Sequence, residues 1–552
     1  MNVQLSRSVL LSCIFVVGMA GVTPASPSPE VRKDPHVPLY DNLGSSHHPI
    51  TTKHPKAQQY FDQGLRLVYA FNHEEAINSF GQALVFDDKA AMAWWGMALA
   101  LGPNINAPMG PAEERRAFEA VQRAKSLMDG IGPSERAYIE ALAARYSSSP
   151  ETGRVERDRA YAAAMEQLWQ RFPSDVDAGT LFAESLMVLQ PWDFWTPDGH
   201  PKGRATDIAA VLERVLTLNP DHPGACHYYI IHTVEASPHP ERALPCADRL
   251  PSLTPGAGHL VHMPGHIYLR LGRYREAAER NIHAAAVDHD LLEHRRLNGI
   301  YPVGYYPHNV HFLWSALTME GRSREAIQAA RQLMTLAPWE KARREPSMEE
   351  FTPTLLFALT RFGKWQDTLE VPEPPAELLY TRAIWHYARG LSLAALGRFD
   401  QAVSERDRLA NMVQTLPDDR TIGVASIAVL AHIAQEVLTG EIAARLGRLE
   451  EAIASLRQAV ALEDGLRYYE PPLWHYPVRH SLGAVLLRAG RAAEAEQVYR
   501  EDLAQHPENG WALFGLVESL RAQGKRDAAA AAEERFRKAW ARADVQLTAS
   551  RF

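Results

Sequence analysis

Four stretches of this chain share one pattern, in which Gly-Arg at a turn is followed by a short acidic and alanine-rich segment. The pattern predicts a repeated helix–turn–helix unit, because glycine commonly ends a helix and amphipathic spacing continues on both sides of it. The four stretches are RLGRYREAAE (270–279), ALGRFDQAVS (395–404), RLGRLEEAIA (445–454) and RAGRAAEAEQ (488–497). Two close variants of them are EGRSREAIQ (320–328) and FNHEEAINSF (71–80).

The unit recurs with small and large residues at fixed positions. A unit that starts at Ala57 places Gly64, Ala76 and Ala83 where two helices must approach closely, with Phe80 to fill the gap between them. Further units start at Gly258, Ala383, Ile433 and Tyr476, and weaker ones near Gly224, Pro307 and Gly510. This pattern resembles the tetratricopeptide repeat (TPR) family. The resemblance implies an all-α, helix–turn–helix superhelical solenoid, and no convincing strand pattern competes with it.

Two loops interrupt the repeats. GPNINAPMGP (102–111) and QPWDFWTPDGHPKG (190–203) are rich in Pro, Gly and aromatic residues. Long loops inside a solenoid often cover something. Asn104, Asn106, Trp192 and Trp195 are therefore candidates for groove lining, although turn formation and edge packing remain the simpler alternatives.

The N-terminal segment has the pattern of a secretory signal peptide. Arg7 is the only charged residue before Glu30, an apolar run follows at 9–22, and Thr-Pro-Ala ends at Ala25. We expect a signal peptide at 1–25, a flexible leader at 26–54, a TPR-like solenoid with inserted loops at 55–370, and further repeats with a capping helix at 371–552. This organisation predicts an exported protein, periplasmic or extracellular, with no stable membrane span after cleavage.

Composition and cysteine count set further limits. The chain has 58 Lys and Arg against 66 Asp and Glu, a net charge of −8, so nonspecific nucleic-acid binding is not expected. Removal of the signal peptide leaves Cys226 and Cys246, which could form a disulfide, stay as buried thiols or bind metal.

Histidine is the unusual residue type. The chain has 23, and twelve of them lie between His222 and His311. The TPR resemblance implies that positions 2, 5, 9 and 12 of the first helix of a unit face the concave groove. These positions hold His259, His262 and His266 in one unit, His308 and His311 in the next, and His232 and Glu235 in the preceding one. Spacings of three, four and seven residues also put such side chains on one helix face.

Imidazoles on neighbouring helices can converge on a metal ion, since packed helices lie about 8–10 Å apart. We therefore interpret His232, His259, His262, His266, His308 and His311 as candidate ligands of a transition metal, most readily copper or zinc, with iron also possible. The same histidines could instead bind an anionic ligand or make structural hydrogen bonds.

The reaction, if any, is left open. Glu235 and Glu184 are candidate bases for metal-activated chemistry, and His480 is a further candidate for the groove lining. Nucleotide-binding loops, HExxH, GxSxG and haem-attachment motifs are absent from the sequence. The alternative is a metal-free scaffold whose groove holds a peptide, a protein or a small molecule.

Overall fold

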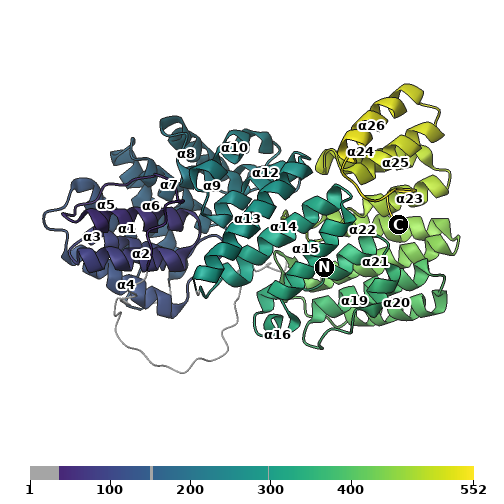
Figure 1. Cartoon of the computed structure of the whole chain (residues 1–552), viewed down its shortest axis with the longest axis horizontal. Coiled ribbons are helices and arrows are strands. Elements are labelled where there is room, and N and C mark those ends of the chain that lie inside the picture. The colour runs from purple at the N-terminus through teal and green to yellow at the C-terminus, as the bar shows by residue number, and fades with distance from the viewer. Residues whose placement is uncertain (1–36, 150–152, 296) are drawn as a thin grey trace, which may run out of the picture.

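The chain folds into an elongated stack of antiparallel helices that follow one another from end to end (Figure 1). This computed structural model describes residues 37–149, 153–295 and 297–552, and only the backbone of residues 231 and 232. The expected signal peptide and the leader up to residue 36 lie outside the described residues. Within the described chain, strands are limited to the short hairpin β1 (Thr421–Ile422) and β2 (Ala425–Ser426).

The helices of the first half are interrupted by loops and irregular turns. They are α1 (Pro55–Tyr69), α2 (His73–Phe86), α3 (Ala91–Ala100), α4 (Pro111–Ser126), α5 (Pro133–Ala143), α6 (Arg154–Arg171), α7 (Val176–Val188), α8 (Ala205–Leu218), α9 (Pro223–Tyr228), η1 (Tyr229–Val234), η2 (Pro240–Ala243), α10 (Leu244–Leu253), α11 (Gly258–His262), α12 (Pro264–Arg270), α13 (Tyr274–His294), η3 (Tyr301–Tyr305), α14 (Tyr306–Met319), α15 (Ser323–Leu336), α16 (Trp339–Ala342), η4 (Pro346–Glu350), α17 (Thr354–Arg361) and α18 (Trp365–Glu370).

The second half is more regular, with pairs of longer helices joined by short turns. These helices are α19 (Leu379–Ala395), α20 (Phe399–Val413), α21 (Ile427–Arg445), α22 (Leu449–Asp464), α23 (Arg479–Arg488), α24 (Ala492–Gln505), α25 (Gly510–Ala522) and α26 (Arg526–Ala539). Of the described helices, α21 alone is long and apolar enough to match a membrane span, and 67% of that stretch is buried against its neighbours.

The small residues of the repeat pattern pack as the sequence predicts. A Cβ added at Gly64 would lie 2.6 Å from the ring of Phe80, so only glycine lets α1 and α2 approach over that ring. Gly483 has the same relation to Tyr499, one helix pair from the C-terminal end. Gly447, in the Leu-Gly-Arg turn between α21 and α22, has φ +80°, a left-handed conformation that favours glycine.

The segment before α1 is packed rather than loose from residue 37 onward. Tyr40 donates a hydrogen bond to Glu75 at 2.7 Å, and Thr51 donates to Glu135 at 2.5 Å. His48 Nδ1 lies 2.8 Å from Asp177 Oδ2. These carboxylates are buried, and the segment supplies the hydrogen-bond donors that they need.

The C-terminal repeats fold back onto the middle of the chain. The amide of Ser323 donates to Asp544 at 2.7 Å, and Trp511 Nε1 donates to the carbonyl of Thr318 at 2.9 Å. The loop 465–478 also brings Glu470 next to His266. This contact places the C-terminal half of the chain against His266.

Cys226 of α9 and Cys246 of α10 form a disulfide, with their Cα atoms 5.1 Å apart. This resolves the alternatives left by the cysteine count in favour of a covalent link. The disulfide links two helices within the histidine-rich segment 222–311.

Candidate metal centre

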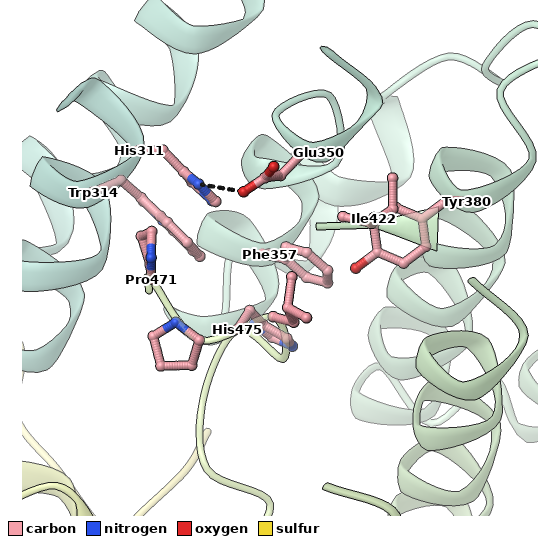
Figure 2. A pocket seen from close by; sticks show the side chains of 10 residues that line it. His311, Trp314, Glu350, Phe357, Tyr380, Ile422, Pro471 and His475 are labelled. Carbon is pink, nitrogen blue, oxygen red and sulfur yellow. Dashed lines mark ion pairs between the residues drawn. The ribbon is translucent and has the colours of Figure 1, made fainter. Parts of the chain in front are cut away.

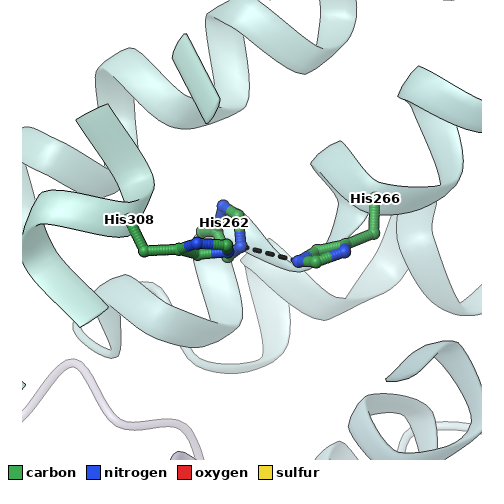
Figure 3. Close-up of side chains that lie close together, drawn as sticks. All are labelled: His262, His266 and His308. Carbon is green, nitrogen blue, oxygen red and sulfur yellow. Dashed lines mark hydrogen bonds between the residues drawn. The ribbon is translucent and has the colours of Figure 1, made fainter. Parts of the chain in front are cut away.

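Three histidines from two helical segments converge at one point. His262 ends α11, His266 lies in α12, and His308 lies in the first turn of α14. One ring nitrogen of each lies within 4.8 Å of one ring nitrogen of the other two (Figure 3). Both segments pack against α13, which therefore sets the distance between them.

The orientation of His262 is fixed by an amide on α13. Its Nδ1 lies 2.7 Å from Asn281 Oδ1, and the Asn281 Nδ2 donates to the carbonyl of Ala277 at 2.8 Å. Because a carbonyl only accepts, the amide nitrogen must face Ala277 and the amide oxygen must face His262. His262 therefore carries its hydrogen on Nδ1, and its Nε2 presents a lone pair.

The orientation of His266 is fixed by carboxylates. Its Nδ1 lies 3.1 Å from Glu235 Oε1 and 3.6 Å from Glu470 Oε2. Burial and the neighbouring Glu235 raise the pKa of Glu470 well above its usual range, which favours the proton of this carboxyl pair on Glu470. With Glu235 ionised, its Oε1 accepts the hydrogen of Nδ1, and the His266 Nε2 presents a lone pair as well. A ligating histidine commonly has its second nitrogen bound to such a carboxylate or amide oxygen.

The two lone pairs face each other. His262 Nε2 and His266 Nε2 are 2.8 Å apart (Figure 3). Two acceptors at this distance repel unless a positive species, a proton or a metal ion, lies between them. Metal–nitrogen bonds of 2.0–2.1 Å in a tetrahedral site separate two ligand nitrogens by about 3.3 Å. A small outward shift of either ring would suit a metal ion.

Burial keeps the imidazoles of His262 and His266 neutral. Loss of solvent lowers the pKa of His266 to about 3 and holds the pKa of His262 well below its usual range. The ring of Phe312 packs against all three imidazoles, with centroid distances of 4.5 to 5.4 Å, and excludes water from one side. Neutral imidazole is the form of histidine that binds metals.

His259 takes part in a different pair. Its Nε2 lies 3.1 Å from the Nε2 of His227, whose Nδ1 donates to the carbonyl of Tyr69 at 2.6 Å. His259 can therefore donate from Nε2 to His227 in an ordinary hydrogen bond. Its ring stacks on Phe71. Of the predicted stripe, only His262 and His266 meet at the candidate centre.

Other predicted ligands lie elsewhere. His311, one turn after His308, stacks on Trp314 with ring centroids 5.2 Å apart, and its Nδ1 is 4.0 Å from Glu350 Oε1. His480 bonds to Arg361 and Asp502 in the C-terminal repeats. The side chain of His232 lies outside the described residues.

The two candidate bases differ in position. Glu235 is fully buried and contacts His266 directly. Glu184 belongs to a separate cluster in α7, where burial raises its pKa to about 7 although Arg145 opposes the shift. No metal-ligating group of the described residues includes Glu184.

The two inserted loops, 102–111 and 190–203, contact each other near Glu235 and Glu470. Trp192 donates from Nε1 to the carbonyl of Ile105 at 3.0 Å and stacks on Tyr469 at 5.6 Å. Trp195 donates to the carbonyl of Thr233, two residues before Glu235. Asn104 accepts hydrogen bonds from the amides of its own turn, at Asn106 and Ala107, so its role is to form that turn.

Asn106 and three residues that the sequence did not predict lie around the buried histidines. Asn106 Nδ2 lies 3.3 Å from the hydroxyl of Tyr305, whose ring contacts His259. Sequence reasoning missed Asn281, Phe312 and Glu470. Asn281 and Phe312 are spaced along helices that were already predicted, so a helical-face argument could have found them. Glu470 comes from a distant loop and gave no signal.

Comparison with known proteins supports the repeat architecture. Residues 438–464 match the model of a tetratricopeptide repeat. No curated protein matches the chain in sequence. The chain is similar, at 12% identity, to the APC/C hetero-tetramer Cut9–Hcn1 (TM-score 0.32, 89% of this chain and 78% of that one) and to a human IFIT1 dimer with m7Gppp-AAAA (TM-score 0.32, 89% and 91%).

Yeast Tom70 is a further similar structure, at 12% identity and a TM-score of 0.29, covering 87% of this chain and 90% of that one. Scores this low carry no argument about function. The matched repeat spans the turn between α21 and α22, and the same glycine–aromatic packing recurs at Gly64 and Gly483. Residues 438–464 thus match a tetratricopeptide repeat, and they lie within an all-α solenoid of helix pairs.

Proposed function

We propose that this chain binds one transition-metal ion through His262, His266 and His308. The observation that carries the proposal is the pair of Nε2 atoms 2.8 Å apart, each on a ring whose Nδ1 is engaged by Asn281 or Glu235. A bound cation removes the repulsion between the lone pairs. A shared proton would do the same, and metal analysis distinguishes the two.

The donor set favours a late first-row metal. Three neutral nitrogen donors suit copper and zinc best, and iron next, whereas calcium and magnesium prefer oxygen ligands. Glu235 and Asn281 would position two of the imidazoles and raise their basicity. Glu235 is therefore assigned a positioning role rather than that of a free base.

A three-histidine site has a vacant coordination position for water or substrate, as catalytic zinc sites do. This supports a metal-dependent enzyme or a metal-handling protein. Export of the chain would give it access to periplasmic or extracellular metal, and the mass of the mature N-terminus tests that part of the proposal.

A second function deserves a test because the fold itself favours it. TPR proteins typically bind protein or peptide partners, and this chain has the TPR scaffold. If it acts only as a scaffold, metal-free protein captures its partner as well as metal-loaded protein does, and chelators have no effect.

The direct test is titration of tag-free, chelator-treated protein with Zn²⁺ and Cu²⁺ against a coloured competing chelator. We expect one equivalent to bind to the wild type and none to the double variant His262→Ala/His308→Ala, with unchanged helical circular dichroism. His289→Ala is the matched control, since that side chain is 62% exposed on α13. Equal uptake by the double variant and the wild type would show that the metal site lies elsewhere.

A further inference from the structure

The segment after the last helix, residues 545–552, runs back over the C-terminal repeats and ends beside α21 and α23 (Figure 1). From Val545 to Ala549 its residues alternate between half-buried and exposed, so one side of the segment is covered. Within the described chain, no backbone-to-backbone hydrogen bond joins this segment to the repeats. A segment held mainly by its side chains can open without unfolding the helices beneath it.

Two of the side chains that hold the segment are Ser550 and Phe552. The hydroxyl of Ser550 donates to the carbonyl of His480 at 2.6 Å and accepts from the hydroxyl of Tyr499 at 2.7 Å, since it has one hydrogen to give. The ring of Phe552 packs against Trp511, with ring centroids 5.8 Å apart. The segment therefore contacts α23, α24 and α25 through one hydroxyl group and one aromatic ring.

Arg551, between these two residues, pairs with a buried carboxylate. Glu441 of α21 is 3% exposed, and its Oε1 lies 2.8 Å from Arg551 Nε. No described residue makes a well-aligned hydrogen bond to either oxygen of Glu441. Arg445, one turn further along α21, donates to the carbonyl of Phe552 at 3.1 Å. Because a buried carboxylate requires a cation, α21 offers a site for a guanidinium group, and the segment fills it.

The surface under the segment is a groove that accepts an extended chain, because it already holds one. About 30 Å³ of free space remains beside Arg551 and Phe552, between α17, α19 and α21, so the segment does not fill the groove completely. The nearby cavity between His311 and Glu350 is different (Figure 2). It has about 10 Å³, room for one water molecule, and no segment of the chain lies in it that could move out.

We propose that residues 545–552 are a displaceable ligand, and that their groove also binds an extended segment of a partner protein in which Arg precedes an aromatic residue. The guanidinium group would pair with Glu441, and the aromatic ring would pack on Trp511. A tethered segment competes at an effective concentration of about a millimolar, so it would keep weak partners out. This inference rests on the scaffold function proposed above and is independent of the metal site, so either can fail without the other.

The test measures the binding of a fluorescein-labelled peptide of residues 545–552 to the full-length chain by fluorescence anisotropy. The variant Arg551→Ala/Phe552→Ala weakens the chain's own segment and leaves the groove unaltered. We expect this variant to bind the peptide at least about tenfold more tightly than the wild type does. Phe552→Ala alone keeps the ion pair and should give a smaller gain. Circular dichroism checks that both variants keep their helices.

A second set of variants tests the guanidinium site. Glu441→Gln, added to the double variant, removes the charge and should weaken peptide binding at least about tenfold. A peptide that carries Arg551→Gln should lose as much affinity. Glu451→Gln is the control, because that carboxylate on α22 is 66% exposed. Wild-type affinity in both variants of the segment would show that residues 545–552 are a fixed part of the fold, and unchanged binding in Glu441→Gln would place recognition elsewhere. Either result would overturn the inference.

Discussion

His262 and His480 occupy the same position, the fifth, in two repeats of this solenoid, yet their surroundings differ. His480 accepts a hydrogen bond from Arg361 on Nδ1 at 2.8 Å and donates from Nε2 to Asp502 at 3.0 Å. Both its nitrogens are thus satisfied within the protein. His262 has one nitrogen bound to Asn281 and directs the other at a second lone pair. A buried histidine with two complementary partners is structural, whereas one that faces another acceptor requires a cation.

The largest expected difference between the two histidines is an effect on stability, and His480→Ala tests it. This substitution removes the partner of the buried Arg361 and Asp502, so we expect the free energy of unfolding to fall by about 3 kcal/mol. Metal content should not change, because His480 does not contribute to the triad. Denaturant unfolding and elemental analysis measure the two effects. Loss of metal with unchanged stability would reverse the roles assigned to the two regions.

The next contrast concerns the residues that orient the rings. Asn281→Ala and Glu235→Ala each remove a partner of an Nδ1 atom, and we expect metal affinity to fall about 10- to 100-fold. The equivalent change in the C-terminal region, Asn509→Ala, removes a hydrogen bond to Asp502 and should leave metal affinity unaltered. Competition titration with a coloured chelator measures all three. Equal effects at the three positions would mean that the losses are only structural.

The pH dependence gives a smaller effect with a defined sign. The pKa of His266 is lowered in the folded state, to about 3, from its ordinary 6.5. Below pH 6.5 the unfolded chain therefore binds more protons, and the metal-free protein loses about 1.4 kcal/mol of stability per pH unit for each such histidine. If the metal-free site holds no proton, as the lowered pKa values of His262 and His266 imply, the metal dissociation constant is nearly constant from pH 7 to 5. A proton shared by these two residues would instead weaken metal binding about tenfold for each pH unit.

Thermal unfolding of chelator-treated protein and metal titration at each pH check these two statements separately. A hexahistidine peptide, whose imidazoles titrate near pH 6.5, is the reference that should lose metal over this range. A parallel loss in the protein would mean that its ligands are exposed or share a proton.

The smallest effect is expected at the loop that covers the region. Trp192 ties residues 190–203 to Ile105 and Tyr469, next to Glu470. Trp192→Ala should speed metal release to excess chelator a few-fold, with little change in affinity, because no ligand is altered. Stopped-flow mixing measures the rate. An unchanged rate would make the loop a packing element only.

The repeat pattern in the sequence was enough to predict the fold, because Gly64 with Phe80 and the Leu-Gly-Arg turns record packing that must recur. It could not predict which histidines meet. His308 and His311 are one turn apart on α14, but ring stacking directs His311 to Trp314 and away from the triad. Side-chain direction depends on such local partners rather than on spacing.

Two further side-chain contacts could not be predicted from the periodicity of the sequence. His259 pairs with His227, a residue of α9 that occupies none of the predicted groove positions. Glu470 reaches His266 only because the C-terminal repeats fold back on the chain, a contact between residues about 200 positions apart. Superhelix closure is a sum of many small rotations, and no single motif encodes it.

Elemental analysis of tag-free protein, purified without added metal, tests the central claim most directly. The account predicts about one equivalent of copper, zinc or iron per chain, lost from His262→Ala/His308→Ala and retained in His480→Ala. Metal-free protein that also fails to take up added Zn²⁺ or Cu²⁺ would contradict it, and would leave a shared proton as the species between His262 and His266.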